Sequence, residues 1–442
     1  MPCTRRPLRV SPGAGRVAPM TGYARMRATA SSPAAASRAE ARSAHREYRD
    51  GLDLLSAEGT TLAAISSSAG CPAWFDPDLG WRRTHGRFQP HKRAYARLVL
   101  ERARDPQEIV CLEVSTSRWE DERDGQALLR GAGWARFSRI DDDPGLTTLA
   151  TLRPRLPSHR VVRYRPGDRC TIHVGDEPDS VWVKVFRDRR GGWMHAHQET
   201  LWGERCRGAL AFAVAQPGWF DEELRALWLG HVVGEPVRRL LGPRGPALGL
   251  AHRMGRALAS LGASAVRPHH TLGAADLLVQ SEGIAAEIRS RVPSLAGELD
   301  RLVERLRALH RAAEGRPHRP IHGAPRPDQW LDAGETLGLV DFDGLALGDP
   351  ELDVATFQAA IDFEAGPRRS RAAVAAAFVA GYESVAGPLD RALLIAYRAH
   401  RRLDEARRSV REIRSDGDRR TGYDLARAMD TFDDPLVAGA VD

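Results

Sequence analysis

Between residues 160 and 186 the chain alternates apolar and polar residues in short runs, a pattern typical of β-strands. The runs lie at 161–166, 170–174 and 181–186, and turn-forming residues such as Pro166-Gly167 separate them. This spacing predicts a three-stranded antiparallel meander.

A helical period dominates the remainder. A helix is expected at about 194–214 and a strand at 226–232. Further helices are expected at 248–262, 274–290, 294–313, 350–364, 369–385, 388–414 and 419–430. One non-helical insertion, residues 318–349, interrupts them. The pattern therefore predicts a small β unit followed by a large helical one.

Residues 51–150 also have the pattern of a folded segment. A helix is expected at roughly 92–104 and a strand at 109–115, which indicates an α/β extension of unknown role. Residues 1–50 are rich in Ala, Arg, Ser, Gly and Pro without an apolar period, which predicts a disordered tail. Such a start fits either an organelle transit peptide or an over-long gene start.

Charge and cysteine content narrow the possible partners. The net charge is +7, but residues 1–39 hold seven arginines and no acidic residue, so the folded part is balanced. It contains no basic patch with interleaved aromatics, and we expect no specific nucleic-acid partner. No window approaches 18 uncharged apolar residues, which argues against a membrane partner. Five scattered cysteines without CxxC spacing favour a cytoplasmic protein.

Candidate chemistry lies in the insertion, which reads Pro320-Ile-His-Gly-Ala-Pro-Arg-Pro-Asp-Gln-Trp-Leu331 and then Leu337-Gly-Leu-Val-Asp-Phe-Asp343. Asp341 follows an apolar run, and a carboxylate at a strand end can hold magnesium against phosphates. Asp343 lies two residues on and can add a second ligand if the strand continues. The alternative is that Asp341 only caps a turn.

Lys184 is the second chemical candidate. The chain has two lysines among 65 basic residues, and this one lies in the strand 181–186. Trp182 and Phe186 flank it on the same strand face. A scarce lysine between two aromatic side chains indicates a functional residue.

These motifs, with Gly348-Asp-Pro-Glu-Leu-Asp353 after them, resemble the H-G-D-x-x-x-x-N, D-F-D and G-D-P-x-x-D run of the aminoglycoside phosphotransferase-like branch of the protein-kinase-like superfamily. The resemblance covers about 160–385 and implies an α+β, bilobal, protein-kinase-like fold. Together with the composition and pattern of the first 150 residues, it gives a tail at 1–50, an N-terminal extension at 51–150, a small antiparallel β N-lobe at 151–234 and a mostly helical C-lobe at 235–442.

The resemblance also implies ATP, or another nucleoside triphosphate, with Mg²⁺. Lys184 matches the family lysine that pairs with nucleotide phosphates. Its partner on the following helix is expected to be Glu199, with Glu204 as the second candidate. Gln329 falls where the family has its second metal ligand, usually Asn, and joins Asp341 and Asp343 as a candidate magnesium ligand.

Other residues take their interpretation from the same pattern. His322 matches the family histidine and is interpreted as a support of the loop in preference to a catalytic group. Arg326 stands where many relatives have histidine and is a candidate phosphate contact. Arg163, Arg165 and Arg169 surround the Pro166-Gly167 turn, where they either cover phosphates or lie in solvent. Asp349 and Asp353 are interpreted as structural, since Asp before Pro350 is a helix-start signal.

Two positions depart from the family pattern. The catalytic aspartate is replaced by Ala324, which can neither orient nor deprotonate a hydroxyl group, a loss that typically costs about 10²–10⁴-fold in rate. Asp328 lies at a different point of the loop, and Asp343 is a candidate substitute. Trp182 stands where a small residue usually roofs the adenine pocket. It can fill that pocket, stack on a displaced base or pack against the rest of its lobe.

Two functions remain open. The first is an ATP- and Mg-dependent phosphotransferase that acts on a small hydroxylated molecule with its base missing or displaced. The second is an inactive pseudokinase that serves as a nucleotide-binding or protein-interaction module, with a peptide or protein partner.

The predicted helix 388–414 bears on the substrate. Its eight arginines are Arg391, Arg398, Arg401, Arg402, Arg407, Arg408, Arg411 and Arg414. If the helix borders the substrate site, they disfavour a cationic antibiotic and favour an anionic or neutral acceptor. The alternative is a solvated helix with internal ion pairs.

Overall fold

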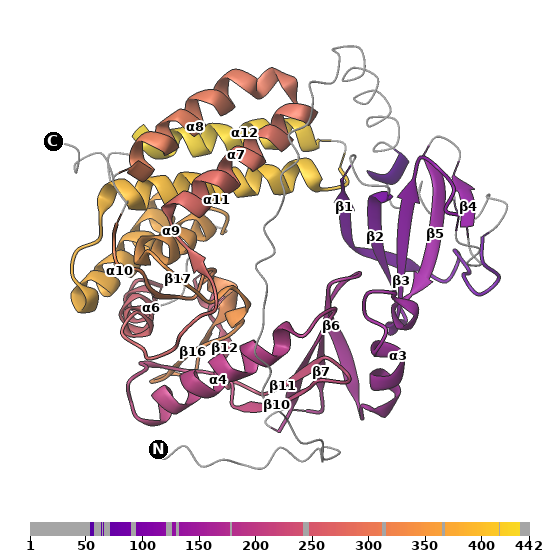
Figure 1. The fold of residues 1–442 in the computed structure, drawn as a ribbon, viewed down its shortest axis with the longest axis horizontal. Coiled ribbons are helices and arrows are strands. Elements are labelled where there is room, and N and C mark those ends of the chain that lie inside the picture. Colours follow the sequence, from indigo (N-terminus) through magenta and orange to yellow (C-terminus); the bar gives the residue numbers. More distant parts are fainter. Residues whose placement is uncertain are drawn as a thin grey trace.

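The computed structural model describes residues 54–56, 63, 65, 71–89, 94–120, 126–129, 132–176, 179–241, 247–311, 315–364, 367–414 and 416–433. The predicted tail at 1–50 lies outside them. The fold is α+β and bilobal, as the sequence predicts. Figure 1 shows the β-rich N-terminal half beside a helical C-terminal half.

The N-terminal extension is an antiparallel sheet with the strand order β1-β2-β3-β5-β4. Its strands are β1 (Trp81–Phe88), β2 (Ala94–Arg102), β3 (Asp105–Ser115), β4 (Gln126–Leu129) and β5 (Gly133–Arg139). The strand predicted at 109–115 is confirmed, but the helix predicted at 92–104 is wrong, because β2 occupies it. Leu98 and Leu100 enter one core and Val99 enters another, so β2 is apolar on both faces and shows no alternation.

The N-lobe is a second sheet, with the strand order β10-β11-β8-β7-β6. Its strands are β6 (His159–Arg165), β7 (Arg169–Val174), β8 (Val181–Phe186), β10 (Pro217–Asp221) and β11 (Ala226–Gly230). The predicted meander is confirmed as β6, β7 and β8. Helix α4 (Arg190–Cys206) ends before the predicted 214, because β9 (Phe212–Ala213) pairs with the C-lobe and buries Phe212 there.

One face of the N-lobe sheet packs against the extension. Val183 and Val185 of β8 share a core with Val99 of β2, Ile109 of β3 and Leu149 of α3 (Leu149–Leu152). The extension and the N-lobe therefore share one core and stabilise each other. Since this face is covered, the opposite face, which carries Lys184, is turned toward the rest of the molecule.

The C-lobe is mostly helical. Its helices are α5 (Val237–Leu240), α6 (Ala247–Leu261), α7 (Ala274–Arg291), α8 (Ala296–His310), α9 (Pro350–Ile361), α10 (Arg368–Ala386), α11 (Arg391–Arg411) and α12 (Gly417–Asp430). Apart from the short α5, which was not predicted, they agree with the predicted helices to within a few residues. Short strands complete the lobe: β12 (Glu235–Pro236), β13 (Thr271–Leu272), β14 (Arg319–Ile321), β15 (Trp330–Asp332), β16 (Leu337–Leu339) and β17 (Ala346–Gly348).

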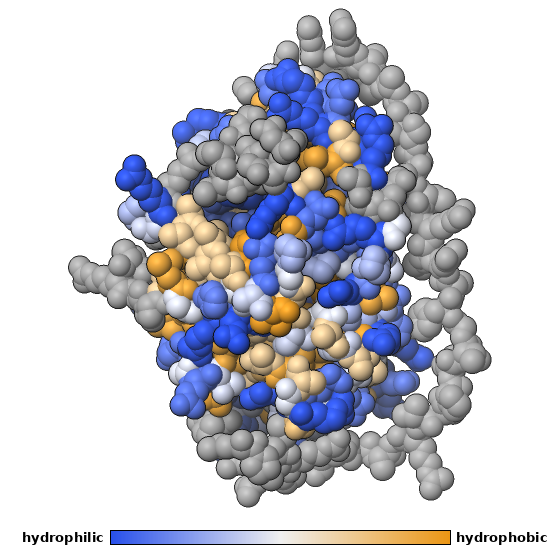
Figure 2. Space-filling view, turned by 90° about the vertical axis from the view of Figure 1, so that its left-hand side faces the viewer, coloured by the Kyte–Doolittle hydropathy of each residue, from blue (hydrophilic) through white to orange (hydrophobic). Residues whose placement is uncertain are grey.

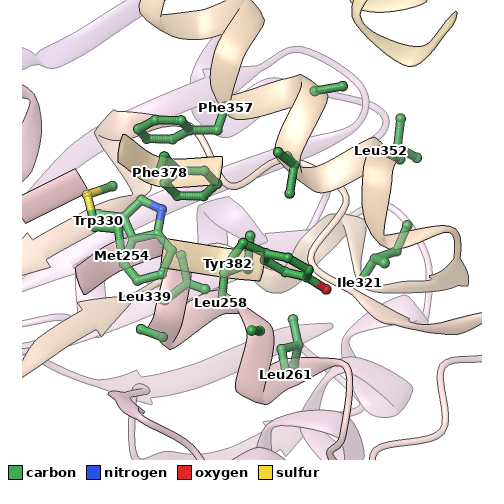
Figure 3. Close-up of a cluster of buried hydrophobic side chains, with 14 of the residues drawn as sticks. Met254, Leu258, Leu261, Ile321, Trp330, Leu339, Leu352, Phe357, Phe378 and Tyr382 are labelled. Carbon is green, nitrogen blue, oxygen red and sulfur yellow. The ribbon is translucent and has the colours of Figure 1, made fainter. Parts of the chain in front are cut away.

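The C-lobe core lies directly under the insertion. Phe357 and Phe378 stack with ring centroids 3.7 Å apart, and Trp330 and Leu339 of the insertion are fully buried in the same core (Figure 3). Burial of these large side chains fixes β15 and β16, because each contributes about 1.5–3 kcal/mol on leaving water. The loops at the ends of these strands are therefore held in place.

The surface is of mixed polarity. On the face seen in Figure 2, hydrophobic residues lie in small groups between hydrophilic ones. Among the described helices, none combines the length and the apolar character that a membrane crossing demands.

Candidate active site

Lys184 of β8 joins the two lobes. Its Nζ atom lies 2.8 Å from Asp341 Oδ1 and 2.5 Å from Asp343 Oδ1, both in the turn after β16. The three side chains are 12%, 29% and 17% exposed, so the contact is largely shielded from water. Two motifs that are 157 residues apart in the sequence therefore meet at one place.

The charged groups of this contact shift one another's pKa values. Burial raises the pKa of Asp341, but the Lys184 ammonium and the Arg169 guanidinium outweigh it and hold that pKa below its usual value. Burial lowers the pKa of Lys184, although Asp341 opposes the effect. The ionised pair is the form in which Lys184 can meet phosphate and Asp341 can meet a cation.

Backbone geometry directs Asp341. Its φ of 67° and ψ of 54° place it in the left-handed region, which asparagine and aspartate tolerate better than other side chains. The preceding Val340 donates its N–H to the Gln329 carbonyl at 3.0 Å. A strained residue held between fixed neighbours is typical of functional sites.

His322 begins the loop that follows β14. Its Nε2 contacts the Val340 carbonyl at 3.0 Å, and its Nδ1 accepts the Ala324 N–H at 3.3 Å. Burial lowers the pKa of His322 to about 4, so the ring is neutral at pH 7. Because both nitrogens are engaged, His322 has none left to take a proton from a substrate.

Asp353 of α9 supports the same loop from below. Its carboxylate accepts the His322 and Gly323 N–H groups, both at 2.7 Å, and burial raises its pKa to about 6. Arg401 of α11 donates to the Gly323 carbonyl at 2.7 Å and to Thr356 Oγ1 at 2.7 Å. Sequence reasoning missed this contact of Arg401, since no motif marks an arginine that binds a backbone carbonyl 78 residues away.

Gly323 permits the loop to pass close to the aspartate turn. Its φ is +81°, and a Cβ atom there would lie 2.3 Å from the Gly344 carbonyl oxygen. A larger residue is therefore excluded by backbone conformation and by space.

Gln329 is buried beside these residues at the end of a short helical turn, Pro327–Gln329. Its Nε2 donates to Asp328 Oδ2 at 3.2 Å, and Arg326 donates to the same oxygen at 3.1 Å. This hydrogen bond uses the amide nitrogen of Gln329, and among the described residues no group donates to its amide oxygen. A carboxylate pair and an amide oxygen are the hard oxygen donors that magnesium prefers.

Neither glutamate proposed as the Lys184 partner contacts that lysine in the described structure. The Glu199 side chain is 53% exposed and lies 3.8 Å from His195 Nδ1. Glu204 is buried and binds Arg207 at 2.6 Å. The expectation of a Lys184–Glu199 pair is corrected, because packing turns the face of α4 that carries Glu199 to solvent and Lys184 binds the two aspartates.

Arg169 and Trp182 complete the N-lobe side. Arg169 of β7 pairs directly with Asp343. Trp182 is half-buried and packs on the His173 ring, with centroids 4.8 Å apart. Both residues share the sheet face of Lys184, since Trp182 alternates with it on β8 and Arg169 is opposite Phe186. The indole therefore contacts a side chain of its own lobe.

The arginines of the predicted helix 388–414 have partners in ion pairs and hydrogen bonds. Arg398 and Arg402 pair with Asp362, and Arg411 pairs with Glu287. The remaining partners are Glu383 for Arg391, Asp404 for Arg407, Asp404 and Glu405 for Arg408, Asp416 for Arg414 and the Gly323 carbonyl for Arg401. The helix therefore presents far less uncompensated charge than its sequence indicates.

A small β-lobe and a helical lobe that meet at a lysine and an aspartate define a protein of the kinase-like phosphotransferase class. The chain belongs to the phosphotransferase enzyme family, whose model matches residues 171–393, half of its length. No curated protein matches the chain.

Several solved structures resemble it at low identity. A choline/ethanolamine kinase family protein from Mesorhizobium loti is 15% identical over 66% of this chain and 94% of its own, with a TM-score of 0.47. A glucosamine kinase in complex with glucosamine, ADP and inorganic phosphate is 18% identical over 85% and 97%, with a TM-score of 0.42. An aminoglycoside-3'-phosphotransferase of type VIII is 24% identical over 59% and 99%, with a TM-score of 0.41.

Proposed function

We propose that this protein binds ATP, or another nucleoside triphosphate, with Mg²⁺ and transfers a phosphoryl group to the hydroxyl of a small molecule. The observation that carries the proposal is the contact of Lys184 with Asp341 and Asp343 across the two lobes. In this function Lys184 and Arg169 neutralise nucleotide phosphates. Asp341, Gln329 and Asp343 hold the metal ion, which supplies neutralisation of charge on the transferred phosphate.

The replacement at Ala324 limits the chemistry. Phosphoryl transfer depends mainly on alignment and charge stabilisation, so an acceptor held in place can react without a positioned base, at reduced rate. Arg326 lies in the same loop and is the candidate that contacts the transferred group. Asp328 already binds Arg326 and Gln329, which ties its carboxylate to positioning.

A pseudokinase is the second candidate, and Ala324 is the observation that favours it. Nucleotide binding and catalysis rest on separable parts of such a site, so the first can persist without the second. In this function the partner is a peptide or protein.

Nucleotide binding is tested by thermal shift. Mg-ATP is expected to raise the Tm of the parent protein, because a ligand that binds only the folded state stabilises it, and Lys184→Ala is expected to abolish the rise. Glu199→Ala is the matched control, because that side chain is 53% exposed and its one ion pair within the described part of the chain is with His195. An absent shift in the parent would refute any nucleotide function.

Turnover separates the two candidates. Radiolabelled ATP is incubated with the parent and with Ala324→Asp in the presence of hydroxylated acceptors. Transfer by the parent supports the phosphotransferase and excludes the pseudokinase. Activity that appears only in Ala324→Asp supports the pseudokinase, since restoring a base is worth about 10²–10⁴-fold.

A further inference from the structure

The N-lobe sheet carries a row of cationic side chains on the face of Lys184. Register places Lys184 of β8 opposite Thr171 of β7, and Thr171 opposite Arg163 of β6. It also places Arg165 opposite Arg169. Directly opposite residues project from the same face of a sheet, so Arg163 and Arg165 lie on the face of Lys184 and Arg169.

The four cations of this face differ in their partners. Lys184 and Arg169 bind Asp341 and Asp343. Arg163 and Arg165 are exposed, and neither side chain has a carboxylate or hydrogen-bond partner among the described residues. This is unusual here, since the arginines of α11 are all engaged. The two unpaired arginines are therefore available to an external anion.

The N-terminal extension places one more cation, Arg87, near the unpaired Arg163 and Arg165. Arg87 of β1 is opposite Arg97 of β2, and Arg97 donates to the Pro166 carbonyl at 3.3 Å, next to Arg165. Arg87 is exposed and, within the described part of the chain, binds no carboxylate.

Contacts with the C-lobe hold this end of β1 in position. Arg291 of α7 donates to the Phe88 carbonyl at 3.4 Å, and Ile413, just past α11, packs in one core with Phe88. The Arg87 backbone is therefore fixed between the extension and the C-lobe.

Electrostatics agree with this placement. Although its tip is exposed, partial burial of the side chain against the sheet lowers the pKa of Arg163, and the neighbouring Arg165 lowers it further. Burial and Arg169 act on Arg165 in the same direction, and burial and Arg411 act on Arg87. Asp341 raises the pKa of Arg163 and Arg165, and Glu287 raises that of Arg87, but the net shift of each pKa is downward. A bound anion would therefore stabilise the three cations further.

We propose that Arg87, Arg163 and Arg165 form an anion subsite that takes a phosphate or carboxylate group of the acceptor. The proposal rests on the proposed function and names the class of its substrate as an anionic hydroxylated molecule. Two strand spacings separate β6 from β8, about 10 Å, and Arg87 lies in another sheet. Arg163 is therefore displaced from Lys184, whereas Arg165 adjoins Arg169 across β6 and β7, so the subsite borders the groups that serve the nucleotide phosphates.

Calorimetry with inorganic phosphate tests the subsite. The protein is first saturated with Mg²⁺ and a non-hydrolysable ATP analogue, and phosphate is then titrated into the parent, Arg87→Gln and the double variant Arg163→Gln/Arg165→Gln. We expect phosphate affinity to fall about tenfold for each arginine removed, while affinity for the analogue changes less than twofold. Arg104→Gln is the control, because Arg104 is exposed in the turn between β2 and β3.

Two results overturn the proposal. The first is phosphate binding by the double variant as tight as that of the parent. The second is absence of phosphate binding to the nucleotide-saturated parent together with weaker analogue binding in the variants, which would assign these arginines to the nucleotide. If the parent does not bind the analogue, the proposed function fails, and the same titration on nucleotide-free protein still decides the subsite.

Discussion

Asp143 ties the N-terminal extension to the turn that faces the proposed nucleotide site. It is 3% exposed, and its carboxylate accepts hydrogen bonds from the Tyr164 hydroxyl, the Gly167 N–H and the Gly145 N–H, each at 2.7 Å. Gly167 forms the β6–β7 turn between Arg165 and Arg169. Replacement of Asp143 therefore perturbs both the stability of the fold and the order of this turn.

The magnitude follows from the contacts. A hydrogen bond to a charged group contributes about 1.5–3 kcal/mol net, and buried groups left without a partner add a penalty. Because the three bonds are not additive, Asp143→Ala is expected to lower the free energy of unfolding by about 3–5 kcal/mol. Asp143→Asn retains acceptor capacity in one oxygen and is expected to cost about 1–2 kcal/mol.

Urea denaturation and hydrogen exchange measure the effect. The midpoint is expected to fall for Asp143→Ala without a change of slope, and exchange of the Gly167 amide is expected to accelerate more than that of amides within β8. Asp142→Ala is the matched control, since Asp142 is adjacent and exposed. The reasoning is refuted if Asp143→Ala is no less stable than Asp142→Ala and the Gly167 amide keeps its protection.

Two further predictions concern the loop after β14. Gly323→Ala is expected to lower the free energy of unfolding by at least about 3 kcal/mol and to abolish Mg-ATP binding. Gly334→Ala is the control: Gly334 has φ +82° but lies in open space, and its replacement is expected to cost about 1–2 kcal/mol. Equal losses in thermal unfolding would contradict the close approach of Gly323 to Gly344. The pKa of His322 is about 4 in the folded protein and near 6.5 when unfolded, so the unfolded chain binds more protons and stability is expected to fall as the pH drops from about 6.5 to about 4. This contribution is on the order of 3 kcal/mol, and His322→Asn is expected to flatten the denaturation profile over that window; a profile of unchanged slope would show that His322 does not stay neutral.

Local sequence determined most of the elements. The meander β6–β8 and the long C-lobe helices have residues of one kind on one face, and that period is visible without any partner. Strand β2 was not predicted because it is buried on both faces. One of these faces packs against the N-lobe sheet, whose residues lie far along the chain. A strand buried between two cores and a buried helix both appear as a continuous apolar run, so periodicity alone does not distinguish them.

The motif spacing also indicated which residues of the site meet. Lys184 and Asp341 are 157 residues apart, and the sequence order of the phosphotransferase family predicted both. It did not predict which carboxylates the lysine binds. Glu199 was the expected partner, but the rotation of α4 about its axis is set by the packing of Met194 with Phe186, which no local pattern encodes.

Only the tertiary structure decided where charges are compensated. The arginines of α11 appear in sequence as a basic helix, yet their partners Asp362 and Glu287 lie on other elements, 36 and 124 residues away for Arg398 and Arg411. Among the described residues Arg163 and Arg165 have no such partner, and Asp143 binds Tyr164 and Gly167, which lie 21 and 24 residues further along the chain. Sequence fixes the number of charges, whereas Coulomb energy depends on the distance and solvation of each pair, which exist only in the folded chain.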